Sequence, residues 1–166
     1  MKVPSRRVLN LAAFLACAGM MAFALYAEHK LFMEPCPLCI FQRIAVIGMG
    51  LAFLLLAIHN PGPGWAKRAY LGLLGLAGIG GIVVAGRHVW LQNLPPDEVP
   101  SCGPGLGYML ENFPFADALK MVFTGSGECA DVDWSFLGLS MPAWVLVCVI
   151  GLAAVGFWNN LHSSRA

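Results

Sequence analysis

Four long apolar runs dominate the pattern of hydrophobic and polar positions along the chain. They cover approximately residues 8–27, 40–58, 69–87 and 141–158, and each contains few polar side chains. A bilayer hydrocarbon core of roughly 30 Å is crossed by about 20 apolar residues in a helix. The pattern therefore predicts an all-α membrane protein, a four-transmembrane-helix bundle that forms a single domain over residues 1–166.

The segments between the runs are unequal. Residues 28–39 and 59–68 are short connectors, whereas residues 88–140 form the one sizeable extramembrane segment. Within that segment, the apolar residues of 115–123 recur at the spacing of one helix face. We expect a short amphipathic helix there, lying on the membrane surface.

Composition agrees with a membrane protein. Of the 166 residues, 58% are hydrophobic and 11% are charged, and the mean hydropathy is +0.71. Soluble domains carry about a quarter charged residues. This shortfall excludes a nucleic-acid binder with a basic face, a disordered linker and most soluble enzymes.

The charges are divided between the two sides of an alternating four-span arrangement. The side with both termini and residues 59–68 carries no acidic residue, and its basic residues are Lys2, Arg6, Arg7, Lys67, Arg68 and Arg165. All nine acidic residues fall on the other side, together with four basic ones. Basic residues near span ends are retained in the cytoplasm, so we expect cytoplasmic termini and residues 28–39 and 88–140 outside.

The first run has an alternative interpretation as a cleaved signal peptide, because Lys2, Arg6 and Arg7 precede it. The run is longer than the roughly 7–15 apolar residues of a typical signal peptide. Its removal would leave the sidedness of the later spans unchanged.

The six cysteines fall into two groups. Cys17 and Cys148 lie in the middle of spans, where a thiol behaves as a small apolar side chain. The other four are expected on the outer side, where disulfides form and persist; they are Cys36, Cys39, Cys102 and Cys129. Four cysteines allow three pairings. Spacing favours Cys36 with Cys39 and Cys102 with Cys129, and other pairings are compatible with stages of a reaction cycle.

The sequence around the first pair is typical of a helix start. Cys36 precedes a proline, which biases its backbone away from the helical region, and Pro37 suits the first helical position. Cys39 then falls in the first turn, at the positive end of the helix dipole. Cys-x-x-Cys thiols at helix N-termini are often activated, so this spacing indicates a reactive pair.

Arg43 lies four residues after Cys39 and therefore on the same helix face. One interpretation is that Arg43 only extends to the lipid head groups. A cation beside an activated thiol also suits an apolar acceptor that gains negative charge, such as a quinone. His88, at the outer end of the third run, either aids proton transfer to that acceptor or anchors the helix at the membrane interface.

Two other interpretations of the outer cysteines remain. Four thiolates that hold structural zinc usually come as two close pairs, whereas 26 residues separate Cys102 from Cys129, so we expect no metal. Inert disulfides are the second interpretation. A bond between Cys36 and Cys39 closes a very small loop and adds little stability, which favours reactivity.

Together these residues resemble the DsbB family of disulfide bond formation proteins. The resemblance rests on four spans, Cys36-Pro37-Leu38-Cys39 with Arg43, the loop cysteines and the stretch from Trp134 to Pro142 that enters the last span. It covers nearly the whole chain. The length between His88 and Cys102 differs by a residue from some relatives, which leaves the role of His88 less secure than that of Arg43.

The resemblance implies an enzyme of the bacterial inner membrane, a protein-dithiol:quinone oxidoreductase with periplasmic cysteines. It would reoxidise DsbA, a periplasmic thioredoxin-fold protein, and pass the electrons to ubiquinone or menaquinone. By this similarity, Cys102 forms the mixed disulfide with DsbA and Cys129 leaves. Cys129 then engages Cys36, and Cys39 is freed against the quinone, with Arg43 and His88 at the quinone site.

Two rival classes are a vitamin K epoxide reductase-like enzyme and a membrane scaffold with stapled loops. The first is expected to carry its redox pair near the last span, where this chain has only Cys148. The second predicts four inert cysteines.

Overall fold

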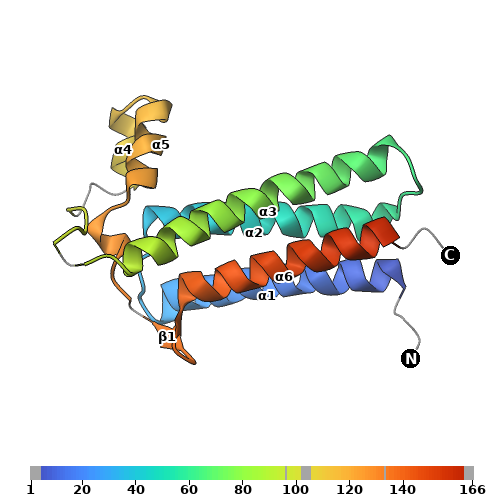
Figure 1. Ribbon diagram of the computed structural model, residues 1–166, viewed down its shortest axis with the longest axis horizontal. Coiled ribbons are helices and arrows are strands. Elements are labelled where there is room, and N and C mark those ends of the chain that lie inside the picture. Colours follow the sequence, from blue (N-terminus) through green and yellow to red (C-terminus); the bar gives the residue numbers. More distant parts are fainter. Residues whose placement is uncertain (1–4, 96, 102–105, 133, 163–166) are drawn as a thin grey trace.

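Four long helices lie side by side in the computed structural model, which describes residues 5–95, 97–101, 106–132 and 134–162 (Figure 1). They are α1 (Arg6–Lys30), α2 (Pro37–His59), α3 (Trp65–Gln92) and α6 (Met141–His162). All four are long and apolar enough to cross a membrane. The prediction of an all-α four-helix membrane bundle is confirmed.

Each helix extends beyond the apolar run that predicted it. The clearest case is α3, which covers Trp65–Gln92 where the run covers 69–87. A backbone hydrogen-bond ladder needs no apolar side chains once it leaves the hydrocarbon, so a helix can continue into the polar layer. As a result His88 is held on a helix and is not part of a loop.

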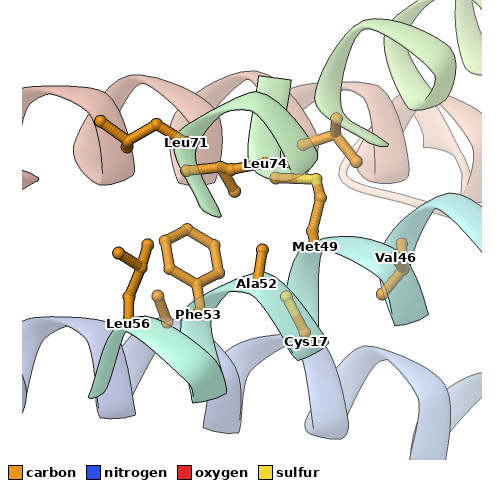
Figure 2. Packing of buried hydrophobic residues seen from close by; sticks show 10 residues of the cluster. Cys17, Val46, Met49, Ala52, Phe53, Leu56, Leu71 and Leu74 are labelled. Carbon is orange, nitrogen blue, oxygen red and sulfur yellow. The ribbon is translucent and has the colours of Figure 1, made fainter. Parts of the chain in front are cut away.

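The core of the bundle lies around α2. This helix packs against α1 and α3, and α3 packs against α6. Figure 2 shows apolar side chains of the core meeting between the helices, among them the fully buried Met49, Phe53 and Leu74. A Cβ atom at Gly156 would lie 2.7 Å from side-chain atoms of both Leu74 and Phe53. The absence of a side chain at Gly156 therefore lets α6 approach closely.

Buried asparagines join α1 and α6 at one end of the bundle. The side-chain oxygen of Asn10 accepts hydrogen bonds from Asn159 at 3.2 Å and Asn160 at 3.0 Å. Arg6 donates to the side-chain oxygen of Asn60 at 2.7 Å, which ties the end of α2 to the same region. This network was not predicted from the sequence. It places the start of α1 and the end of α6 together, away from the outer cysteines.

The long segment between α3 and α6 forms short elements at the opposite end. They are α4 (Leu106–Asn112), α5 (Phe115–Thr124), the 3₁₀ turn η1 (Gly127–Cys129), β1 (Ser135–Phe136) and β2 (Leu139–Ser140). In Figure 1, α4 and α5 run across the long axis of the bundle. The predicted helix over 115–123 is present as α5, and its placement on a membrane surface stays a prediction. The seven-residue α4 and the β1–β2 hairpin were not predicted, because such short elements leave little periodic pattern.

Candidate active site

The Cys-x-x-Cys segment begins α2 as the sequence predicts. Cys36 precedes the helix with extended backbone (φ −64°, ψ 162°), and Pro37 occupies the start of the first turn. The sulfur of Cys36 accepts a hydrogen bond from the backbone N–H of Cys39 at 3.4 Å. The two sulfur atoms are 3.2 Å apart. Both thiols thus lie in the positive field of the helix N-terminus.

Cys129 reaches this pair from a distant part of the sequence. It ends η1, is 1% exposed, and its Sγ lies 3.7 Å from the Oγ of Ser126. The sulfur atoms of Cys129 and Cys36 and a ring nitrogen of His88 all lie within 4.8 Å of one another. The neighbouring sulfur of Cys36 and burial both raise the pKa of the Cys129 thiol.

Cys102 lies outside the described residues. Its predicted pairing with Cys129 therefore stays a prediction.

Arg87 holds the segment that leads to Cys129. Its Nε donates to the carbonyl oxygen of Phe123 and its Nη2 to that of Thr124, both at 2.9 Å. These carbonyls end α5, and a cation is favourable at a helix C-terminus. The guanidinium also lies over the ring of Trp90, 4.1 Å from its centre. Arg87 therefore attaches α5, and the turn after it, to the end of α3.

His88 lies beside the first two cysteines. Its Nε2 is 3.9 Å from the sulfur of Cys36 and its Nδ1 is 4.0 Å from that of Cys39. The amide nitrogen of Gln42 is 2.9 Å from Nδ1. His88 is only 3% exposed, which favours a place in this site over an anchor at the membrane interface. Gln42 was missed in the sequence, although its place three residues after Cys39 puts it on the same helix face.

Arg43 forms an ion pair with Glu28 near the end of α1. Its Nη2 also donates to the carbonyl oxygen of Ala24 at 3.3 Å. A charge at this depth is costly without a partner, and the carboxylate of Glu28 supplies one. Glu28 was not predicted as a partner of Arg43. The signal that could have indicated it is an acidic side chain at the end of the first apolar run.

A pocket with a volume of about 110 Å³ opens beside these residues. A single water molecule needs only roughly 10–15 Å³ by the same measure, so the pocket is more than a packing defect. Its lining combines apolar side chains from three helices with the polar groups described above. The apolar ones include Met20, Met21, Val46 and Val145, and the polar ones include Cys36, Cys39, Gln42, Arg43 and His88.

The sequence was compared with known families and proteins. The family model described as "Disulfide bond formation protein DsbB" matches residues 6–159. This chain belongs to the DsbB family. A "Disulfide bond formation protein B" of Methylococcus capsulatus is 55% identical over 163 residues, which cover 96% of this chain and 98% of that relative.

Other DsbB-family proteins match over similar lengths. "Disulfide bond formation protein B" of Saccharophagus degradans is 50% identical and covers 98% of both chains. The protein of the same name from Hahella chejuensis is 52% identical and covers 91% of both. Membership of the DsbB family, with four apolar helices, makes this chain a multi-pass membrane oxidoreductase of disulfide bond formation.

Proposed function

We propose that this chain reoxidises a DsbA-like thioredoxin-fold protein by thiol–disulfide exchange and transfers the electrons to a membrane quinone, ubiquinone or menaquinone. One observation carries the proposal. The sulfur of Cys36 lies 3.2 Å from that of Cys39 and within 4.8 Å of that of Cys129. In thiol–disulfide exchange a sulfur changes partner through attack by a thiolate, and Cys36 has two partners in reach.

The exchange begins at the loop disulfide. A thiolate of the reduced DsbA-like donor attacks the bond between Cys102 and Cys129, forms a mixed disulfide with Cys102 and releases Cys129. Cys129 then attacks Cys36, which forms a Cys36–Cys129 bond and releases Cys39 as a thiolate.

The donor's second thiolate then attacks the mixed disulfide, which completes the donor disulfide and releases Cys102. Cys102 attacks Cys129, which restores the loop disulfide and releases Cys36. Cys36 and Cys39 form their bond again when two electrons pass to the acceptor. Over the full cycle two donor thiols become one disulfide, and the four cysteines give up two electrons, with two protons released from the donor thiols.

The residues of the pocket fit a quinone. Methionine and valine side chains offer apolar walls for a ring that arrives from the bilayer, and Cys39, Arg43 and His88 face the same pocket. A bound quinone would accept the two electrons and two protons. The guanidinium of Arg43 favours negative charge beside Cys39. A ring nitrogen of His88 is placed to hold or pass a proton.

The orientation that we propose places the cysteine end of the bundle in the periplasm of a bacterial inner membrane, with both termini cytoplasmic. The charge division supports it, since basic residues without acidic ones accompany the termini. The asparagine network also gathers the first turns of α1 and the last turns of α6 at one end. On this placement α5 lies in the outer interface, with its apolar face buried against the bundle.

An anaerobic turnover assay tests this function. Purified protein in detergent is mixed with a soluble quinone analogue and a reduced DsbA-like donor, and quinone absorbance and donor thiols are followed together. We expect equal loss of quinone and of donor thiol pairs. Cys39→Ser should abolish the loss of quinone and limit the loss of donor thiols to one pair per chain, whereas Cys148→Ser, a matched replacement in the middle of α6, should leave both losses unchanged.

Arg43 offers a further arm of the same assay. Arg43→Met should lower quinone reduction while donor exchange with the loop cysteines persists as a trapped mixed disulfide. Folded protein that turns over no quinone with several quinones and several thioredoxin-like donors would contradict the proposal. That outcome would favour a scaffold whose cysteines are structural.

A further inference from the structure

The cysteine site also contains three side chains of the types that bind metal ions. Sulfur atoms of Cys36 and Cys129 and a ring nitrogen of His88 lie within 4.8 Å of one another, and all three side chains are buried. They come from the start of α2, from η1 and from α3. We propose that the fully reduced site binds a soft divalent cation such as Zn²⁺ through these three side chains.

The spacing is close to that of a zinc site before any ion is present. Zn–S bonds of about 2.3 Å and Zn–N bonds of about 2.0–2.1 Å in a tetrahedron put neighbouring ligand atoms roughly 3.4–3.8 Å apart. The sulfur of Cys36 is already 3.9 Å from Nε2 of His88. Side-chain shifts of a few tenths of an ångström bring these two atoms to the distance between neighbouring zinc ligands.

The charge balance suits a buried site. Binding removes one proton from each of the two thiols, and two thiolates with a neutral imidazole exactly offset a divalent cation. The resulting cluster has no net charge, which limits the cost of burying it. Cys36 and His88 line the pocket, so an ion has a path of entry to these two ligands.

Binding depends on the redox state. A disulfide of Cys36 with either Cys39 or Cys129 removes at least one of the ligands, so oxidised protein loses the site. A bound cation in turn holds two thiolates that exchange requires. Inhibition of turnover by the metal follows from the proposed function, whereas binding itself depends on the geometry alone.

The test uses the full-length protein with Cys17 and Cys148 replaced by alanine, which removes two thiols outside the site. The protein is reduced under anaerobic conditions, freed of reductant and titrated with Cd²⁺, whose bonds to thiolates absorb in the ultraviolet. We expect one Cd²⁺ per chain, release of two protons, and displacement of Cd²⁺ by Zn²⁺. Oxidised protein should show none of these signals.

Variants locate the ligands. Cys129→Ser and His88→Gln should each weaken binding by at least about 100-fold, since loss of an outer-sphere partner alone costs about 10–100-fold. His29→Gln is a matched control that should bind as tightly as the parent, because His29 is exposed near the end of α1 and lies outside the site. Circular dichroism and thermal unfolding check that each variant is folded. If His88→Gln does not fold, Cys129→Ala takes its place as the second ligand variant.

Each result bears on one proposal. Equal Cd²⁺ affinity in oxidised protein or in folded Cys129→Ser would overturn the metal site. Turnover of quinone without any metal binding would overturn it too, while the proposed function stands. Metal binding in a protein that never turns over would support the site and contradict the proposed function.

Discussion

Gly125 offers a sharp test of how Cys129 is positioned. It follows α5 with φ +89° and ψ 156°, a region of backbone space that is essentially restricted to glycine. A Cβ atom at Gly125 would lie 2.5 Å from Cδ1 and 3.1 Å from Cδ2 of Leu91. Leu91 is fully buried, so its methyl groups have little room to move. Gly125→Ala therefore meets both backbone strain and a steric clash.

The two costs can be added. The backbone conformation costs about 1–3 kcal/mol, and overpacking costs typically about 1–3 kcal/mol. The sum of roughly 2–6 kcal/mol is a large fraction of the usual stability of about 5–15 kcal/mol. The strain is confined to the turn after α5, so we expect this turn to open locally while the core around α2 stays folded.

Alkylation measures the opening. The fully reduced protein is exposed to a maleimide, and modification of each cysteine is followed by peptide mass spectrometry. We expect Cys129 to react at least about 30-fold faster in Gly125→Ala, which corresponds to about 2 kcal/mol of easier opening. Cys17, which is buried in the core, should react as in the parent.

Gly138→Ala is the matched control. Gly138 also has a positive φ of +79°, but among the described residues nothing lies within 4 Å of its Cβ position. This variant carries backbone strain without the clash and lies outside the turn that holds Cys129. Unchanged Cys129 reactivity in Gly125→Ala would refute the idea that contact with α3 positions the loop cysteine.

Three further predictions concern the surroundings of the site. Arg87→Met removes two charge-assisted hydrogen bonds at the end of α5, each worth about 1.5–3 kcal/mol. The backbone amides of α5 should therefore exchange hydrogen faster, and Arg87→Lys should slow this exchange again in part. Gln42→Met leaves buried His88 without its partner at a cost of about 1–3 kcal/mol, so thermal stability and quinone turnover should both fall, whereas an unchanged pH–rate profile would argue against a positioning role. The raised pKa of Cys129 means that the folded, reduced protein keeps a proton that the unfolded chain releases above about pH 8.5. The contribution of the Cys129 thiol to stability is therefore complete below that pH and declines above it. At pH 8.5 we expect Cys129 to be alkylated far more slowly in folded than in denatured protein. Cys36→Ala should reduce that difference.

Local sequence patterns were sufficient for the bundle and for the start of α2. Four apolar runs of suitable length have few alternatives to membrane-spanning helices. A proline after Cys36 similarly sets where α2 begins, because it fits the first turn and disfavours a helical residue before it. The amphipathic pattern of 115–123 likewise predicted α5. Each of these features depends on residues within one continuous segment of the chain.

Contacts between segments that are far apart in the sequence could not be predicted from it. Glu28 and Arg43 lie on different helices, and nothing in their local sequence indicates that they form an ion pair. The partnership of Gln42 with His88 likewise depends on the rotation of α2 against α3. Such rotations follow from the packing of many core side chains at once.

The sequence alone determined the membrane class and the four helices, because hydrophobic length acts locally, and charge placement and cysteine spacing supplied the predictions of sidedness and of reactive residues. Only the tertiary structure decided that Cys129 packs beside Cys36, with His88 buried next to both Cys36 and Cys39. The physical reason is that α5 and η1 are held to α3 by Arg87 and by the close contact at Gly125. Their position depends on how the helices pack, which no single segment specifies.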